Sequence, residues 1–368
     1  MGIVPIRVLE WRAAAFSDPV KRLRFLQDAG TRPKGATART TLVAITLALA
    51  LVSAALVQPV WRHTPPPKAP SSTRILKGLQ PETAPGSVWL VEANPRFDLY
   101  SNGLQVENQY VTGTQARGYL AFPRQGMDPQ RARLRLDPAG IVFHTTESHI
   151  APFEEGQNGT LKRAGEGLLE YVRRNHSYHF VIDRFGRVFH IVRESDYANH
   201  AGHSVWADQS WVYVNLNQSF FGVAFEAKSQ PEEAGLPVNP AQVHTARILV
   251  EMLRARYKIP AANCVAHAQV SVNPSNGRAG FHTDWAANLP FRELGLTDNY
   301  QRPLPSVLLF GFTTEGPLAE EGAASEALVE QQAGARGIPL QRYREILQRR
   351  YLDAIGASRS KGVLGEKN

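Results

Sequence analysis

The stretch "YHFVIDRFGRVFHIV" (178–192) decides the fold of this chain. Apolar and polar residues alternate on either side of "RFG", which predicts two short strands joined by a tight turn. Two further apolar runs predict strands, "GIVFHTT" (140–146) and "FFGVAFEAK" (220–228). Apolar residues recur with a helical period at 161–175 and 239–259. Strands that alternate with helices indicate an α/β domain with a mixed β-sheet flanked by helices.

The predicted domain covers residues 136–295 and is bordered by two segments to which the sequence assigns no role. Residues 86–135 are β-rich, with short runs such as "GSVWLVEA" and "GYLAF" between turn residues. In the C-terminal extension 296–368, "SVLLFGF" (306–312) predicts a strand, and the pattern of 340–355 predicts a helix.

The composition is that of a globular protein, with 43% hydrophobic and 20% charged residues. The formal net charge of +8 suggests a nucleic-acid partner, but eight Lys/Arg and only three Asp/Glu lie in residues 1–39. The rest of the chain is close to balanced, which argues against nucleic-acid binding by a folded basic surface. Cys264 is the only cysteine, so an intrachain disulfide is excluded.

The segment "TTLVAITLALALVSAALVQPVW" (40–61) predicts a transmembrane anchor, because about 20 apolar residues span a bilayer as a helix. A buried soluble helix and a cleaved signal peptide are the alternatives. The basic tail 1–39 precedes the span, so the positive-inside rule places the N-terminus in the cytoplasm. A Pro-rich linker, 62–85, follows. The chain is therefore expected to cross the cytoplasmic (inner) membrane once, with its body periplasmic or otherwise extracytoplasmic.

Two histidines occupy strand ends in a way that predicts a metal site. His144 ends the run 140–146, and His267 follows the short apolar run that begins at Cys264. A carboxylate from the loop after His267 would complete a set of two nitrogens and one oxygen. Such a set leaves the fourth position of a tetrahedral zinc ion open, which is typical of a catalytic site.

Five segments, in order, resemble the zinc-dependent N-acetylmuramoyl-L-alanine amidases, a family that includes phage lysozyme-type amidases and peptidoglycan recognition proteins. The resemblance covers roughly residues 138–295. The segments are "IVFHTTES", "SYHFVIDRFGRVFHIV", "NHAGHSVW", "GVAFEAK" and "YKIPAANCVAHAQVS". The resemblance implies the amidase fold, bound Zn²⁺ and a peptidoglycan (muropeptide) substrate; it names no protein partner.

The resemblance also implies the metal ligands. His144 and His267 match the two histidine ligands of the family, and "HTD" (282–284) matches its Lys/Thr-x-Asp end. Asp284 then becomes the third ligand, and His282 falls at a polar catalytic position. In the competing alignment His282 is the third ligand and Asp284 supports it. The loop is longer than in typical members, and Trp285 replaces the usual proline.

The implied reaction is hydrolysis of the amide between N-acetylmuramic acid and L-alanine by a zinc-activated water. Glu226 would be the general base and then the general acid, and His282 would stabilise the oxyanion. Tyr178 matches a tyrosine that some members place near the reacting amide, although packing alone also explains a tyrosine there. Two alternatives remain: a peptidoglycan-binding module of the same fold without catalysis, and an enzyme that cleaves a different amide.

Overall fold

The computed structural model describes residues 86–148, 151–229 and 237–362. These residues lie in one compact unit, Leu79–Asn368. The predicted basic tail, membrane anchor and linker (1–85) lie outside the described residues. Within the described part of the chain, no helix is both long enough and apolar enough to cross a membrane.

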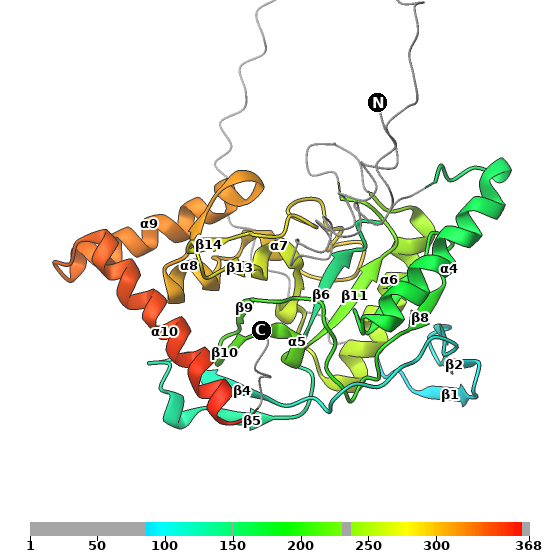
Figure 1. The fold of residues 1–368 in the computed structure, drawn as a ribbon, viewed down its shortest axis with the longest axis horizontal. Coiled ribbons are helices and arrows are strands. Elements are labelled where there is room, and N and C mark those ends of the chain that lie inside the picture. Colours follow the sequence, from blue (N-terminus) through cyan, green and yellow to red (C-terminus); the bar gives the residue numbers. More distant parts are fainter. Residues whose placement is uncertain (1–85, 149–150, 230–236, 363–368) are drawn as a thin grey trace, which may run out of the picture. The chain divides into compact units, whose positions relative to one another are not determined.

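A mixed eight-stranded sheet forms the centre of the described unit (Figure 1). Its strands, in spatial order, are β1 (Leu90–Ala93), β2 (Phe97–Tyr100), β3 (Gln105–Glu107), β8 (Val188–His190), β7 (Phe180–Ile182), β11 (Phe220–Phe225), β6 (Gly140–Thr145) and β12 (Cys264–Ala266). The four strands β7, β11, β6 and β12 run parallel, whereas β7 and β8 form the predicted antiparallel hairpin. The prediction of a mixed sheet is confirmed.

The two faces of β6 pack against different partners because successive side chains of a strand point to opposite faces. Ile141 and Phe143 lie in one core cluster with Leu249 and Leu253 of helix α6 (Pro240–Tyr257). Val142 lies in a second cluster on the other face, and His144 shares that face by the same alternation.

Helices α4 (Asn158–Arg174) and α6 confirm the helices predicted from periodicity. Leu169 of α4 packs against Ala224 of β11, so α4 covers the face of the sheet that carries His144. Asn239 begins α6 with a capping box to Gln242, which satisfies amides that the first turn leaves unpaired.

A second, antiparallel sheet has the order β5 (Arg133–Arg135), β4 (Tyr119–Pro123), β10 (Trp211–Val214) and β9 (Val205–Ala207). Tyr119 and Tyr213 pack with Phe220 and Val142 between the two sheets. Residues 86–135 are therefore part of the folded core: β1–β3 extend the central sheet, and β4 and β5 build the second one.

The C-terminal extension contains helices α8 (Pro305–Phe310), α9 (Ala319–Ala335) and α10 (Leu340–Ser360). The strand predicted at 306–312 is wrong, because most of it forms α8. Pro305 suits the first turn of a helix, and Gly311 ends it with a φ of 66°. Periodicity alone does not separate a short buried strand from a short buried helix. The helix predicted at 340–355 is confirmed.

The remaining elements are short. A three-stranded sheet joins the extension to the preceding loop through β13 (Val272–Asn273), β14 (Arg278–Ala279) and β15 (Thr313–Thr314). The short helices are η2 (Pro129–Arg131), η3 (Glu155–Gln157), α5 (Leu216–Ser219), η4 (Ala261–Asn263), α7 (His267–Val270), η5 (Asn299–Gln301) and η6 (Gly316–Leu318).

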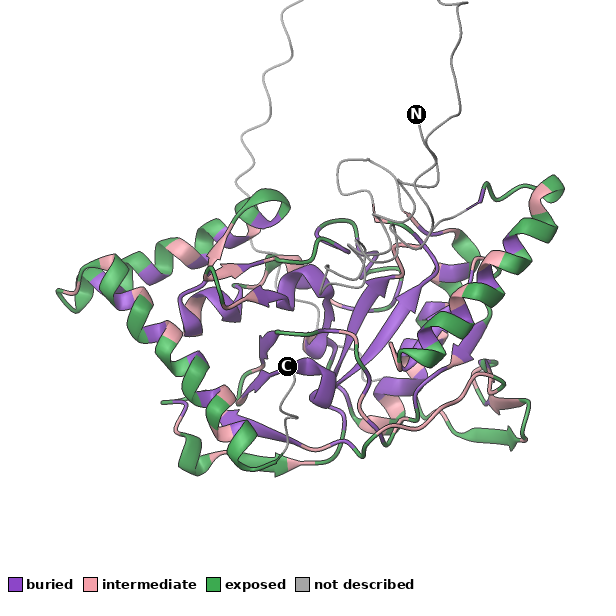
Figure 2. Cartoon of the chain, viewed as in Figure 1, coloured by how far each residue is buried: buried purple, intermediate pink, exposed green. Residues whose placement is uncertain are grey.

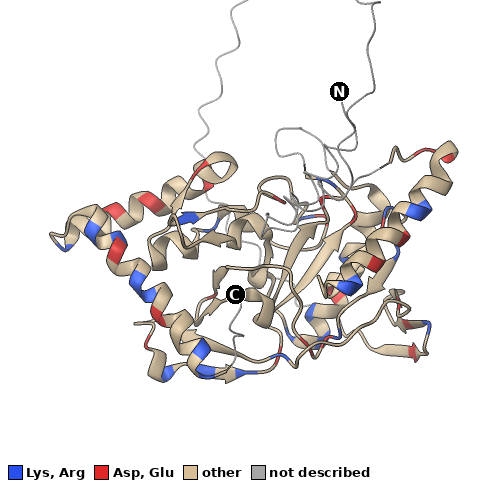
Figure 3. Ribbon diagram, in the orientation of Figure 1, with Lys and Arg blue, Asp and Glu red and all other residues tan. Residues whose placement is uncertain are grey.

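Buried residues line the central strands, whereas charged residues lie on the helices. Figure 2 shows β6 and β11 buried along their length, whereas α4, α9 and α10 each keep an exposed side. Along α4 and α10 both signs of charge occur (Figure 3). Mixed faces of this kind are typical of solvated helices.

A substitution at Gly140, the first residue of β6, tests how tightly the strand that carries His144 is packed. A Cβ at this position would lie 2.2 Å from Phe220 Cε1 and 2.3 Å from the Asn263 carbonyl oxygen. We expect Gly140→Ala to lower the free energy of unfolding by about 3 kcal/mol or more, since overpacking of a core forces backbone shifts. Chemical denaturation measures this.

Gly167 on the exposed side of α4 provides the matched control. No atom lies within 4 Å of a Cβ built there. Gly167→Ala should raise the free energy of unfolding by up to about 1 kcal/mol, because alanine favours the helix. Equal effects of the two substitutions would contradict the packing described for β6.

Candidate metal centre

Parallel pairing brings His144 and His267 together. In the register of β12 with β6, Ala266 faces Phe143, so the next residues along the two strands are His267 and His144. Both strands end at the same edge of the sheet, and α7 begins at His267. The two imidazole centroids lie 4.4 Å apart.

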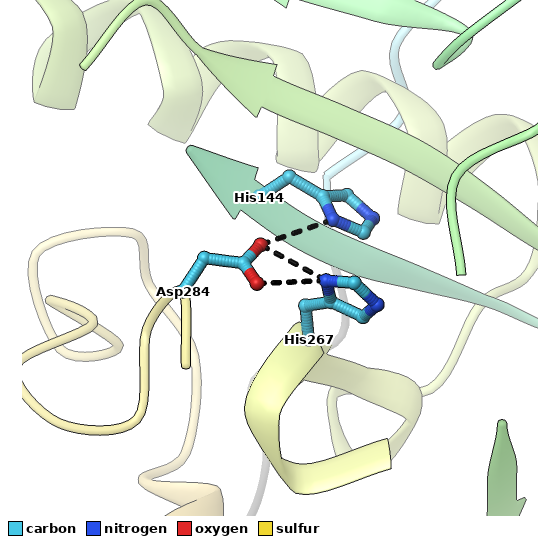
Figure 4. A group of neighbouring side chains, drawn as sticks. All are labelled: His144, His267 and Asp284. Carbon is cyan, nitrogen blue, oxygen red and sulfur yellow. Dashed lines mark hydrogen bonds and ion pairs between the residues drawn. The ribbon is translucent and has the colours of Figure 1, made fainter. Parts of the chain in front are cut away.

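Asp284 completes the group from the loop that follows β14 (Figure 4). Its Oδ1 lies 2.8 Å from His267 Nδ1, and its Oδ2 lies 3.0 Å from the same nitrogen and 3.2 Å from His144 Nδ1. One ligand atom from each of the three residues lies within 4.8 Å of the others. All three side chains are buried, with at most 7% of any residue exposed.

The donor set fits a zinc ion. Ligands about 2.0–2.1 Å from a tetrahedral zinc are about 3.3 Å from one another. The nitrogen–oxygen distances of 2.8–3.2 Å are close to that spacing, so a small outward movement would accommodate the metal. Two Nδ1 atoms and one carboxylate form the open three-ligand set of catalytic zinc sites.

The charge states also suit a metal. Burial, followed by the neighbouring His267, lowers the pKa of His144 below its ordinary value, so the imidazole is neutral at pH 7. Burial would raise the pKa of Asp284, but His267 and His144 outweigh burial and hold it well below its usual range. A neutral imidazole and an ionised carboxylate are the forms that bind Zn²⁺.

His282 lies beside this group but does not belong to it. Its ring stacks on His267 with centroids 4.5 Å apart and an angle of 19°, and the residue is exposed. Its backbone N–H donates to Ser271 Oγ at 3.0 Å. The arrangement favours Asp284 over His282 as the third ligand, an assignment that stays a prediction.

Tyr178 lies beside His144, with ring centroids 5.0 Å apart. Its φ of 62° is in the left-handed region, which a tyrosine rarely adopts. Burial, followed by the charges of Asp284 and Glu147, raises the pKa of the hydroxyl, which therefore stays protonated and can donate a hydrogen bond.

Glu226 follows β11 and is buried, but its contacts are away from the metal centre. Its Oε2 accepts the backbone N–H of Arg184 at 3.1 Å and lies 3.6 Å from where a Cβ at Gly165 would be. The cross-strand neighbour of His144 on β11 is Ala224. Glu226 is two residues further, about 7 Å along the strand. Its predicted role as acid and base stays a prediction.

His200 contacts the centre, although sequence reasoning did not place it there. Its Nδ1 lies 3.1 Å from His144 Nε2. The only sequence signal was its position in "NHAGHSVW", because a single histidine among eleven carries little information.

The C-terminal extension holds the loop that supplies Asp284. Thr313 N–H donates to the Gly277 carbonyl at 2.8 Å, and Arg278 forms an ion pair with Glu315 at 2.6 Å. On α7, Gln269 Nε2 donates to Glu321 of α9 at 2.7 Å. The extension therefore contacts both the loop before Asp284 and the short helix that begins with His267.

The two alignments of the loop predict different metal binding. We expect Asp284→Ala to abolish stoichiometric zinc binding, because it removes the only oxygen ligand of the group. His282→Ala should retain zinc, since its ring stacks on a ligand without joining the group. Metal analysis of the purified variants measures this. Loss of zinc from His282→Ala, with zinc retained by Asp284→Ala, would reverse the assignment.

Glu321 makes stability depend on pH. Burial raises the pKa of its carboxyl from 4.5 to about 7. Between these values the folded protein keeps a proton that the unfolded chain has lost, so stability falls as the pH rises from 4.5 to 7. Glu321→Gln removes this loss, and its advantage over wild type should grow across that window to about 2 kcal/mol.

Denaturation at pH 5 and pH 8 measures the Glu321 effect. Glu320→Gln is the control, because Glu320 is the exposed preceding residue. An advantage that does not change with pH would contradict the raised pKa.

Comparison with known proteins agrees with this geometry. Residues 134–284 match the family described as N-acetylmuramoyl-L-alanine amidase. An 89-residue segment is 33% identical to the N-acetylmuramoyl-L-alanine amidase AmiD of Escherichia coli (strain K12) and covers 23% of this chain. That segment spans 31% of the length of AmiD.

Two solved structures are similar over part of the chain. AmiD of E. coli, in complex with anhydro-N-acetylmuramic acid-L-Ala-D-gamma-Glu-L-Lys, is 20% identical over 55% of this chain and 65% of its own, with a TM-score of 0.33. AmpDh3 of Pseudomonas aeruginosa, in complex with anhydromuramic pentapeptide, is 22% identical over 43% of this chain and 58% of its own, with a TM-score of 0.32. Residues 134–284 are therefore similar in sequence to the N-acetylmuramoyl-L-alanine amidases, and the segment matched to AmiD spans about a third of the length of AmiD.

Proposed function

We propose that this protein is a membrane-anchored zinc amidase that hydrolyses the amide bond between N-acetylmuramic acid and L-alanine in peptidoglycan. The observation that carries the proposal is the buried group of His144, His267 and Asp284 at the end of two parallel strands. The group lies within the segment that matches the amidase family.

Three residues of the site would bind the metal, and a fourth would stabilise the negative charge that develops on the substrate. When bound, zinc would lower the pKa of a water molecule to about 7 and polarise the scissile carbonyl. His144, His267 and Asp284 would hold it, because their donor atoms already face one another. Exposed His282, stacked on His267, is positioned to donate to the developing oxyanion from the solvent side.

Tyr178, whose ring lies beside that of His144, can assist as a hydrogen-bond donor. Its raised pKa keeps the hydroxyl protonated, so it acts as a donor and not as a base. A donor near the reacting carbonyl stabilises the transition state more than the ground state, because negative charge develops on the oxygen.

Glu226 is our proposed acid and base. Burial raises the pKa of its carboxyl, which suits a group that must both accept and return a proton near neutral pH. The carboxylate accepts the Arg184 amide N–H. Proton transfer therefore requires the side chain to leave this amide or a water molecule to bridge the distance.

We also propose anchoring through residues 40–61, with residues 1–39 in the cytoplasm and the amidase domain outside the cytoplasmic membrane. The support is the absence of charge between Arg39 and Arg62 and the excess of Lys and Arg before the span. The substrate lies outside that membrane, and a Pro-rich linker would let the domain reach it.

A binding module without catalysis is the second candidate function. The zinc-compatible group favours the enzyme, because recognition of a glycan-peptide by itself needs no open metal position. A catalytic assay on the metal-loaded protein separates the two.

We expect the zinc-loaded full-length protein in detergent to release peptides from peptidoglycan that end in a free L-alanine amine. Chelation should abolish the release, and added zinc should restore it. Glu226→Gln should keep its zinc and lower kcat by about 10²- to 10⁴-fold, the usual contribution of general acid–base catalysis. Mass spectrometry of the products and a steady-state assay measure these effects.

Glu170→Gln is the control, because Glu170 is an exposed acid on α4. Zinc-loaded protein that binds peptidoglycan without cutting it would favour the binding module. Cleavage at another bond would indicate a different amide. Unchanged kcat in Glu226→Gln would transfer the proton role to another group, such as His282, whose ring stacks on His267.

A further inference from the structure

His144, His200 and a backbone carbonyl form a hydrogen-bonded chain behind the metal centre. His144 Nε2 lies 3.1 Å from His200 Nδ1, and His200 Nε2 lies 3.2 Å from the Phe220 carbonyl oxygen. The other nitrogen of His144, Nδ1, faces Asp284. One end of the chain is therefore a metal-ligating position, and the other end is a fixed backbone acceptor.

The backbone end determines where the protons lie. A carbonyl oxygen only accepts hydrogen bonds, so His200 Nε2 carries a proton. Among the described residues, the ring nitrogens of His200 contact His144 Nε2 and the Phe220 carbonyl oxygen, and neither partner carries the negative charge that would stabilise an imidazolium, so the ring is the neutral form with one donor and one acceptor nitrogen. Its Nδ1 is then an acceptor, and His144 Nε2 must donate to it. In a neutral His144 this leaves the lone pair on Nδ1, the atom that faces the metal position.

The surroundings hold His200 in this position. Its backbone N–H and that of Ala201 donate to Asn217 Oδ1 at 2.8 and 2.6 Å. Gly222 provides the space for the ring, because a Cβ there would lie 2.6 Å from His200 Cγ. Gly222 and the Phe220 acceptor both belong to β11, the strand next to β6.

The second histidine ligand, His267, is held differently. Among the described residues, no hydrogen-bond partner is found for His267 Nε2, although this atom is buried. His267 is oriented by its Nδ1 contacts to both oxygens of Asp284. Within the part of the chain that the structure describes, the two ligands are therefore held by different means: His144 through Nε2 by His200, and His267 through Nδ1 by Asp284.

We propose that His200 is a positioning residue that selects the Nδ1 metal-binding tautomer of His144 and fixes the orientation of its ring. The inference rests on the proposed metal site. Partners of this kind usually contribute 10- to 100-fold to metal affinity. The effect should therefore appear in zinc binding itself, before any substrate is added.

The experiment measures zinc affinity by chelator competition for the full-length protein and two variants. His200→Leu keeps bulk but removes both hydrogen bonds, and we expect its affinity to fall about 10- to 100-fold. His200→Asn retains an acceptor for His144 Nε2, so it should recover much of that loss. His203→Leu, which removes an exposed histidine from the same segment, should bind zinc like wild type.

Nuclear magnetic resonance of the wild-type protein loaded with ¹¹³Cd and labelled with ¹⁵N-histidine tests the same point without a variant. We expect coupling of cadmium to His144 Nδ1, and a slowly exchanging proton on His144 Nε2. Coordination through Nε2 overturns the proposal, even where His200→Leu fails to fold.

The outcomes also separate this inference from the proposed function. Wild-type protein that binds no zinc contradicts the metal site itself. Wild-type protein that binds zinc, with equal affinity in His200→Leu, overturns only the role of His200. Equal losses in His200→Leu and His200→Asn show that the acceptor at this position does not matter, which also overturns it.

Discussion

The candidate site depends on the parallel pairing of β6 with β12. This pairing ends both strands at one edge of the sheet and places His267 beside His144. Side chains from residues 123 positions apart in the sequence meet there only because the sheet register is correct. A shift of one residue would turn His144 to the opposite face, towards α6. Close packing around Gly140, where no side chain fits, resists such a shift.

The third ligand depends on a different part of the molecule. Asp284 follows a long loop, and such a loop would have many conformations by itself. Here β14 pairs with β15, and Glu321 of α9 accepts from Gln269 on α7. The C-terminal extension thus restrains the loop from one side, while the central sheet positions the histidines from the other. Both parts are needed to bring three donor atoms within reach of one metal ion.

Much of this could be predicted from the sequence, for identifiable physical reasons. Alternation and helical periodicity are local properties, and they predicted the hairpin of β7 and β8 and the helices α4, α6 and α10. The short run 306–312 was predicted wrongly, because a few apolar residues satisfy a strand and a helix equally well. The contact of His200 with His144 was not predicted. It arises between β11 and a loop, and no spacing in the chain encodes it.

The sequence by itself determined the class of fold and the kinds of donor available: two histidines at strand ends and an acid in a loop. It also contained Glu226, but not the direction of its carboxylate. Only the tertiary structure decided that this carboxylate accepts from Arg184, and that Tyr178, His282 and His200 surround the ligands. The reason is that a side chain's neighbours are set by sheet register and by packing between distant segments. The residue types within one segment specify neither of these.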